Sequence, residues 1–181
     1  VPAQSGTWLD NVEPATGAVY GRIPRSGEAD VEAAVEAARA AFPAWRAWAP
    51  AERRAVLSRL ADKVAEHADV LAAAESKDNG KPISLAAAVD IPRAEQNLRF
   101  YASAAEQFAS ESHTMGDGTV NYTLRKPLGV VGCISPWNLP LYLFTWKIAP
   151  ALASGNCVVA KPSEVTPMTA FMLGQWAKEA G

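Results

Sequence analysis

Two short polar stretches each follow an apolar run, and both contain residue types that could bind a ligand or react. The first is SPWN, residues 135 to 138, in which the uncharged amide of Asn138 lies between Pro136 and Pro140. A polar side chain at such a junction requires either a hydrogen-bond partner or a reacting group. The second stretch is KPSE, residues 161 to 164.

The KPSE stretch has the composition of a site for a ribose. Lys161 and Ser163 offer donors, and the carboxylate of Glu164 can accept hydrogen bonds from both ribose hydroxyls. A 2′-phosphate would be repelled by this carboxylate, so the stretch favours NAD over NADP. The same residues are also compatible with a strand end followed by a helix cap, and both interpretations stay open from these four residues alone.

The elements around the two stretches should bring them together. The apolar patterns predict a strand at 129 to 134, a helix at about 140 to 154, a strand at 156 to 160 and a helix at 167 to 180. A right-handed crossover makes the two strands parallel, so that their carboxyl ends lie at one edge of the sheet. Ligands of open α/β sheets bind at that edge, and we therefore expect SPWN and KPSE to meet there.

The first two thirds of the chain are predicted to be mostly helical. The predicted segments are a hairpin around the turn at 14 to 17 and helices at 28 to 42, at 51 to about 78 with a break near His67, and at about 85 to 110. The fold class is therefore α/β: N-terminal helices and a hairpin, plus the first part of a Rossmann-like parallel sheet, truncated.

Helix boundaries are predicted from capping residues. Ser26 or Asp30 is the candidate cap for the helix that begins near residue 28, and Thr166 with Pro167 should cap and open the last helix. His67 and His113 have no neighbouring residue that suggests catalysis or metal binding, so both are expected to be solvated, His113 in a loop.

Composition narrows the classes of function. The 181 residues carry a formal net charge of −2, with 49% hydrophobic and 20% charged residues, which does not favour binding to nucleic acid or to an anionic membrane. No apolar run is long enough to span a bilayer and no signal peptide pattern is present, so the sequence predicts a soluble, cytoplasmic protein. The first residue is valine, which suggests that an upstream segment has been removed. Cys133 and Cys157 lie in apolar runs and are expected to be buried thiols.

The usual dinucleotide and phosphate-loop fingerprints are absent, but a longer stretch is informative. The segment GVVGCISPWNLPLYLFTWKIAPALASGNCVVAKPSEVTPMTA resembles the cofactor domain of the aldehyde dehydrogenase superfamily. The resemblance extends through PATGAVYGRIP, EADVEAAVEAARAAFPAW and ESKDNGKPI. The pattern DIPRAEQNLRFYAS is most similar to the branch that oxidises 2-aminomuconic and 2-hydroxymuconic semialdehydes. The resemblance implies that residues 1–181 form a partial cofactor-binding domain, with about 113–130 contributing to a β oligomerisation arm and the catalytic domain absent.

The resemblance also implies roles for individual residues. Asn138 is the catalytic residue, because its amide donates to the oxyanion that forms when a cysteine attacks the aldehyde. In the semialdehyde branch, an arginine of the DIPR pattern binds the substrate carboxylate, and Arg93 is the corresponding residue here. The alternative is that Arg93 forms a surface ion pair with Asp90 or Glu95. The implied cofactor is NAD. Its adenosine ribose is expected to bind to Lys161, Ser163 and Glu164, and the rest of the dinucleotide to Trp137 and to the backbone of Ile134, Ser135 and Pro136. For Trp137, simple packing is an equally good interpretation.

The nucleophilic cysteine, the general-base glutamate and the glycine-rich turn of such enzymes are expected beyond Gly181. Cys133 and Cys157 should not replace the nucleophile, because burial raises the pKa of a thiol. We therefore expect a fragment of an NAD-dependent aldehyde dehydrogenase, inactive by itself, whose full-length form is a homo-oligomer acting on a small aldehyde. The alternatives are a non-catalytic nucleotide-binding module, a relative that forms acyl-coenzyme A, and a purely structural fragment.

Overall fold

A computed structural model describes residues 2–181. Its elements, in chain order, are β1 (Trp8–Val12), β2 (Val19–Pro24), α1 (Glu28–Ala47), α2 (Pro50–Glu66), α3 (Ala68–Asn79), α4 (Ile83–Leu85), the π-helical turn η1 (Ala86–Asp90), α5 (Ile91–Gln107), β3 (Ser112–Thr114), β4 (Val120–Tyr122), β5 (Val130–Ile134), α6 (Pro140–Ala153), β6 (Cys157–Lys161) and α7 (Met168–Ala180).

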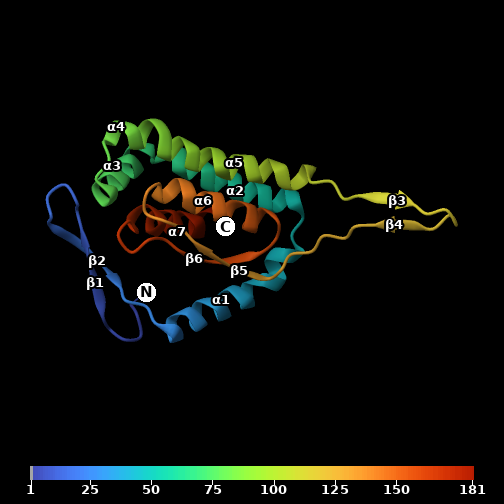
Figure 1. Ribbon diagram of the computed structural model, residues 1–181, viewed down its shortest axis with the longest axis horizontal. Coiled ribbons are helices and arrows are strands. Elements are labelled where there is room, and N and C mark those ends of the chain that lie inside the picture. Colours follow the sequence, from blue (N-terminus) through green and yellow to red (C-terminus); the bar gives the residue numbers. More distant parts are fainter. Residues whose placement is uncertain (1) are drawn as a thin grey trace.

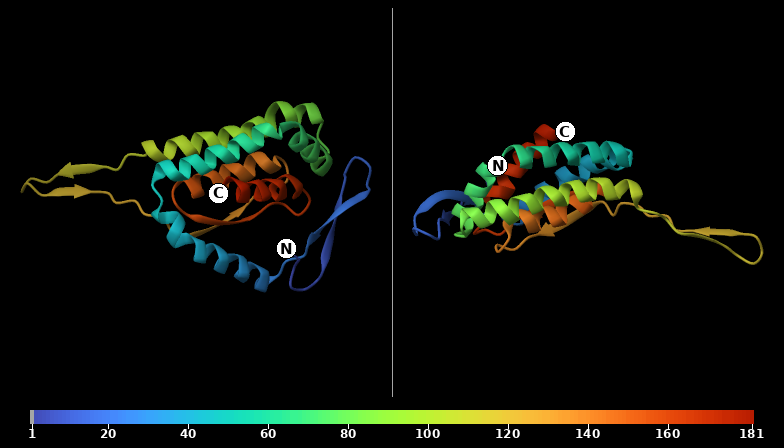
Figure 2. Two further views of the ribbon diagram at one scale, coloured as in Figure 1. Left: turned by 180° about the vertical axis from the view of Figure 1, so that it is seen from behind. Right: turned by 90° about the horizontal axis from the view of Figure 1, so that it is seen from above.

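The helices form the body of the molecule, and two hairpins extend from it. Figure 1 shows the β3–β4 hairpin projecting from one end of the body and the β1–β2 hairpin at the opposite end. The two further views in Figure 2 keep the hairpins at opposite ends. The predicted N-terminal hairpin is therefore confirmed, whereas His113 lies in β3 and not in a loop.

The core lies where α2, α5, α6 and α7 meet, and it is filled by leucine and isoleucine side chains that burial removes from water. The largest fully buried apolar side chains are Leu57, Leu60, Leu71, Ile91, Leu98, Leu141 and Leu173. This core fixes α6 against the helices that precede it, so the loop that leads into α6 has a rigid base.

The predicted parallel pair is confirmed. Strand β5 pairs with β6 in parallel, in a register that runs from Val130 opposite Cys157 to Ile134 opposite Lys161, and α6 forms the crossover between them. Within the described part of the chain this sheet has only these two strands. Gly155 follows α6 with φ +88°, as expected for the residue that ends a helix.

The predicted caps of two helices are wrong. The N-cap of α1 is Gly27 and not Ser26 or Asp30, although Asp30, three residues later, contributes through its Oδ2, which accepts a hydrogen bond from the Gly27 amide at 2.9 Å. Thr166 does not cap α7: its hydroxyl is buried without a partner among the described residues. The amide of Met168 instead donates to Asp78 Oδ2 at 2.7 Å, so the cap comes from α3.

The break predicted near His67 is confirmed, since His67 separates α2 from α3. His67 is half-buried and thus only partly solvated, because its imidazole stacks on the ring of Trp176 with 4.5 Å between centroids. Helix α1 also continues past Phe42 and through Pro43 to Ala47. The indole of Trp45 donates to the carbonyl of Leu152 at 3.1 Å, a tertiary contact that supports the last turn of α1.

Candidate functional site

The two polar stretches meet at the carboxyl edge of the sheet. The amide of Ser135 donates to the carbonyl of Lys161 at 3.1 Å, directly after the last register pair of β5 and β6. SPWN and KPSE are separated by more than 20 residues in sequence, yet they are hydrogen-bonded neighbours in space. The juxtaposition expected from the strand order is therefore present.

The KPSE stretch presents a charged pair at this edge. Lys161 Nζ lies 3.1 Å from Glu164 Oε2, and both side chains are 61% exposed. A hydrogen bond from its own backbone amide, and then the neighbouring Lys161, lowers the pKa of Glu164 below its ordinary value. Ser163 Oγ accepts a hydrogen bond from the amide of Val165 at 3.4 Å. The site thus offers an ionised, accessible carboxylate beside a cation.

The SPWN stretch has one inward side chain and several outward ones. Ser135 is buried, and its hydroxyl donates to the carbonyl of Leu143 at 3.5 Å. The side chains of Ile134 and Trp137 are 71% and 59% exposed. Asn138 is also exposed, and no hydrogen bond in the described part of the chain uses its side-chain amide. This amide is available to a ligand.

The backbone of SPWN accepts hydrogen bonds from the last residue of α3 and from the turn that follows it. Asn79 Nδ2 donates to the carbonyl of Trp137 at 2.7 Å. Lys81 Nζ donates to the carbonyl of Asn138 at 3.2 Å. Sequence reasoning did not assign a role to Asn79 or Lys81; the only available signal was their position in the polar segment ESKDNGKPI at a helix end.

Lys81 belongs to a buried charged cluster beneath the loop. Its ammonium forms an ion pair with Asp90 and lies 4.0 Å from Glu75 Oε1. Glu75 Oε2 accepts hydrogen bonds from the hydroxyl of Thr169 at 3.0 Å and the amide of Leu141 at 3.4 Å. Burial, with a smaller contribution from the charge of Asp90, raises the pKa of Glu75 to about 7, although Thr169, Lys81 and the amide of Leu141 lower it. The cluster ties α3, η1, α6 and α7 together below the site.

Arg93 lies on the first turn of α5 and contacts the first turn of α6. Its Nη2 donates to the hydroxyl of Tyr142 at 3.2 Å, and its guanidinium carbon lies 5.3 Å from the centroid of that ring. The predicted alternative of an ion pair is wrong, because Asp90 pairs with Lys81 and Glu95 pairs with Arg99 at 2.7 Å. Over residues 2–181 Arg93 has no carboxylate partner, and it is exposed.

Neither cysteine has the surroundings of a nucleophile. Cys133 and Cys157 are both buried, and burial raises the pKa of each thiol above its ordinary value. Residues 2–181 contain no group of three or more metal-ligating side chains that could hold a metal ion. No helix in the same range is long and apolar enough to cross a membrane.

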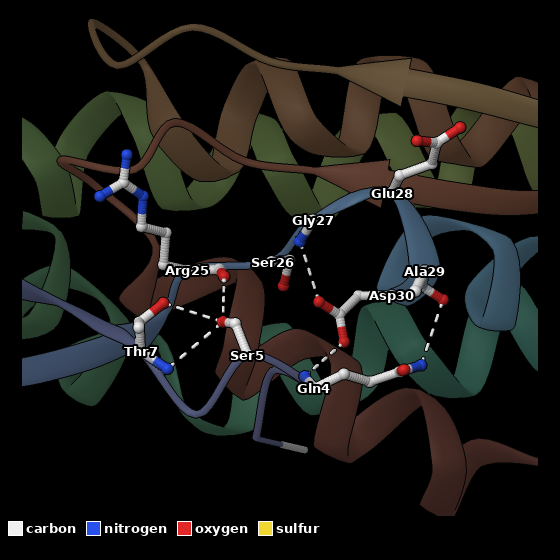
Figure 3. Close-up of a pocket in the computed structure, with 9 residues that line it drawn as sticks. All are labelled: Gln4, Ser5, Thr7, Arg25, Ser26, Gly27, Glu28, Ala29 and Asp30. Carbon is white, nitrogen blue, oxygen red and sulfur yellow. Dashed lines mark hydrogen bonds between the residues drawn. The ribbon is translucent and has the colours of Figure 1, made fainter.

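A hollow of about 320 Å³ lies elsewhere, at the start of α1. Figure 3 shows Asp30 turned toward the backbone of Gly27 and Gln4, and both oxygens of this carboxylate accept hydrogen bonds from these two amides. None of the predicted site residues lines the hollow. The sheet edge, and not this hollow, is the candidate functional site.

A parallel strand pair with a crossover helix is the building unit of α/β folds, in which ligands bind at the carboxyl edge of the sheet. The chain belongs to the aldehyde dehydrogenase family, whose family model matches residues 1–181. It is 54% identical over 176 residues to the 2-aminomuconic semialdehyde dehydrogenase of Bos taurus, covering 97% of this chain and 36% of the relative. It is 46% identical to the 2-hydroxymuconic semialdehyde dehydrogenase of Pseudomonas sp. (strain CF600), and the match covers 100% of this chain and 38% of that relative.

Solved structures agree with this assignment. An indole-3-acetaldehyde dehydrogenase of P. syringae, solved with NAD+ and IAA, superimposes with a TM-score of 0.96 at 39% identity, covering 100% of this chain and 37% of that one. PnpE in complex with nicotinamide adenine dinucleotide gives the same TM-score at 41% identity, with the same coverage. The chain therefore spans little more than a third of the length of these relatives.

Proposed function

We propose that the full-length protein carrying this chain is an NAD-dependent aldehyde dehydrogenase that oxidises a carboxylate-bearing semialdehyde to a carboxylic acid. The observation that supports this proposal is that SPWN, which carries the unengaged Asn138 amide, and KPSE, which carries the Lys161–Glu164 pair, follow neighbouring parallel strands and are joined by the hydrogen bond from Ser135 to Lys161. The names of the relatives, which include semialdehyde dehydrogenases and NAD complexes, support it.

The residues at the edge fit NAD. Lys161 and Ser163 can donate to the adenosine ribose, and the ionised carboxylate of Glu164 can accept from both of its hydroxyls. The exposed Ile134 and Trp137 side chains and the backbone through Pro136 offer a surface for the rest of the dinucleotide. When bound, NAD supplies the acceptor for the hydride that leaves the substrate.

Asn138 supplies the oxyanion donor. Attack by a nucleophile places negative charge on the aldehyde oxygen, and a positioned amide N–H stabilises that charge as it develops. A lysine would also bind the anionic carboxylate product, so an uncharged donor favours the transition state over the product. The buried Cys133 and Cys157 do not serve as the nucleophile, and residues 1–181 alone therefore do not oxidise aldehydes.

Arg93 supplies the specificity for a carboxylate. Its guanidinium is exposed, has no acidic partner among residues 2–181, and is supported by Tyr142 on α6. A planar guanidinium binds a carboxylate through two parallel hydrogen bonds. Tyr142 lies in the first turn of α6, and Asn138 lies two residues before that helix begins, so the residue proposed to bind the carboxylate and the oxyanion donor are both near the N-terminal end of α6.

The β3–β4 hairpin is the proposed oligomerisation arm. Its residues are exposed on both strands, and it projects away from the helical body (Figure 1). A short two-stranded ribbon leaves unpaired backbone groups at its edges, and pairing with a second copy would satisfy them. The proposed partners of the full-length protein are thus a small aldehyde and further copies of itself.

The experiment that tests the proposal replaces Asn138 in the full-length enzyme. Asn138→Ala should lower the single-turnover rate of NADH formation by about 100- to 1,000-fold, the usual cost of removing one oxyanion donor. Gln96→Ala is the matched control, because Gln96 is an exposed amide on α5 outside the site. A rate for Asn138→Ala close to that of the control would reject the assigned role.

A further inference from the structure

The loop that carries Asn138 is attached to the protein at two consecutive peptide units. The carbonyl of Trp137 accepts from Asn79 Nδ2 at 2.7 Å, and the carbonyl of Asn138 accepts from Lys81 Nζ at 3.2 Å. Both donors come from one turn, residues 79 to 81, which begins at the last residue of α3. Two adjacent contacts from one rigid turn restrain both the position and the rotation of a loop, whereas one contact would leave it free to pivot.

The turn itself has little conformational freedom. Gly80 separates the two donors and adopts φ +80°, a left-handed conformation that L side chains rarely adopt. A Cβ atom added at Gly80 would lie 2.9 Å from Cγ of Pro14 in the β1–β2 turn. The amide of Gly80 also donates to the carbonyl of Ser76 at 2.8 Å, which ends α3. Asn79 and Lys81 are therefore presented at a fixed spacing.

Buried carboxylates hold the Lys81 ammonium in place. Its side chain is only 8% exposed, and the ion pair with Asp90, whose side chain is 1% exposed, balances its charge. An ammonium has three donors, and the positions of Asp90 and Glu75 leave one of them for the carbonyl of Asn138. A buried lysine with these partners cannot move without leaving a charge unpaired, which is costly.

From this geometry we infer that Asn79 and Lys81 are positioning residues for the catalytic amide of Asn138. The inference rests on the proposed function of Asn138. Neither residue touches the reacting atoms, since both act on the backbone of the loop. They hold the Asn138 peptide so that its exposed side-chain amide is aimed before the aldehyde arrives. Pre-orientation of this kind matters because a misplacement of about 1 Å can cost about a hundredfold in rate.

The test is a double-mutant cycle in the full-length enzyme, with the single-turnover rate of NADH formation as the readout. In the otherwise unchanged enzyme, Lys81→Met and Asn79→Ala should each slow this rate by about 10- to 100-fold and leave NAD affinity within about twofold. In the Asn138→Ala background, the same substitutions should change the rate by less than about twofold, because the group that they position is already gone.

Control variants separate positioning from damage to the fold. Lys77→Met removes a lysine from the same helix end, where its ammonium lies 4.7 Å from the centroid of the Tyr20 ring and does not contact the loop. The single-turnover rate of this control variant should equal that of the unchanged enzyme. Lys81→Met leaves Asp90 buried without its cation, so Lys81→Met combined with Asp90→Asn keeps the charge balanced. Asn79→Ala disturbs no buried charge and tests the inference if the lysine variants do not fold.

The outcomes for the inference and for the proposed function differ. If Asn138→Ala slows the reaction but Lys81→Met and Asn79→Ala do not, the positioning role is wrong and the function of Asn138 stands. Equal slowing in both backgrounds would also overturn it, because the residues would then act independently of Asn138. If Asn138→Ala itself leaves the rate unchanged, the proposed function fails and the inference fails with it.

Discussion

The guanidinium of Arg93 is exposed and has no acidic partner among residues 2–181, and it lies over the ring of Tyr142. We predict that Arg93→Ala raises the Michaelis constant of the full-length enzyme for a carboxylate-bearing semialdehyde by about tenfold or more, since a charge-assisted hydrogen bond contributes about 1.5 to 3 kcal/mol. The constant for a neutral aldehyde should hardly change. Arg99→Ala is the control, because Arg99 is already paired with Glu95 and Asp62. Equal effects on both aldehydes would remove Arg93 from the site.

Glu164 is the residue expected to recognise the ribose. We predict that Glu164→Ala weakens NAD binding by about tenfold, which is the loss expected for hydrogen bonds from ribose hydroxyls to an ionised carboxylate. The preference for NAD over NADP should also narrow, because the repulsion of the 2′-phosphate disappears. Titration calorimetry of both nucleotides measures the two effects, with the exposed Glu32→Ala as control. An unchanged ratio of affinities would contradict the assigned role.

At the scale of the elements, the site depends on helices that are joined by buried polar groups and not only by apolar packing. Asp78 in α3 accepts hydrogen bonds from Asn11 in β1, Tyr20 in β2 and the amide of Met168 at the start of α7. Burial is the main cause that raises the pKa of the Tyr20 hydroxyl above its ordinary value. One carboxylate thus connects the N-terminal hairpin to the helix that follows KPSE.

Glu75 gives this part of the molecule a predicted pH dependence. Its pKa rises from 4.5 to about 7 in the folded protein, so folding favours the protonated carboxyl. The stability linked to this group is fully present below pH 4.5 and is lost as the pH rises through about 7. Because one pKa unit corresponds to about 1.4 kcal/mol, the loss is on the order of 3 kcal/mol.

Glu75→Gln should remove this dependence. The amide keeps an acceptor for the hydroxyl of Thr169 and has no charge to bury. We expect the melting temperature of the wild type to fall more between pH 5 and pH 8 than that of Glu75→Gln. The exposed Glu66→Gln is a suitable control, and parallel melting curves for the wild type and Glu75→Gln over this range would contradict the prediction.

At the scale of the whole molecule, the described residues 2–181 expose large apolar side chains along the β3–β4 arm and near the parallel sheet. Leu128 is 91% exposed and Tyr122 is 67% exposed. We predict that these 181 residues, purified by themselves, self-associate, because apolar patches and open strand edges favour pairing between copies. Sedimentation should show a distribution of oligomers, and charged substitutions at Val120 and Tyr122 should reduce it. A sharp monomer that melts cooperatively would contradict the prediction.

The sequence by itself determined the local elements and the place where they converge. Strongly periodic helices, the apolar strands and the hairpin turn follow from residue spacing, and the crossover rule then puts Asn138 and Glu164 at one edge, because parallel strands end on the same side. The family resemblance supplied candidate roles for these residues and for Arg93. Local propensity and connection handedness act over short distances, so they can be read from neighbouring residues.

Only the tertiary structure decided which distant groups support the site. Asp78 caps α7 in place of Thr166, Lys81 pairs with Asp90 and reaches the carbonyl of Asn138, and no periodic pattern indicates any of these contacts. The physical reason is that a buried polar group must find a partner wherever packing places one, at any separation along the chain. Such pairings depend on the orientation of packed helices, which is fixed only when the whole core forms.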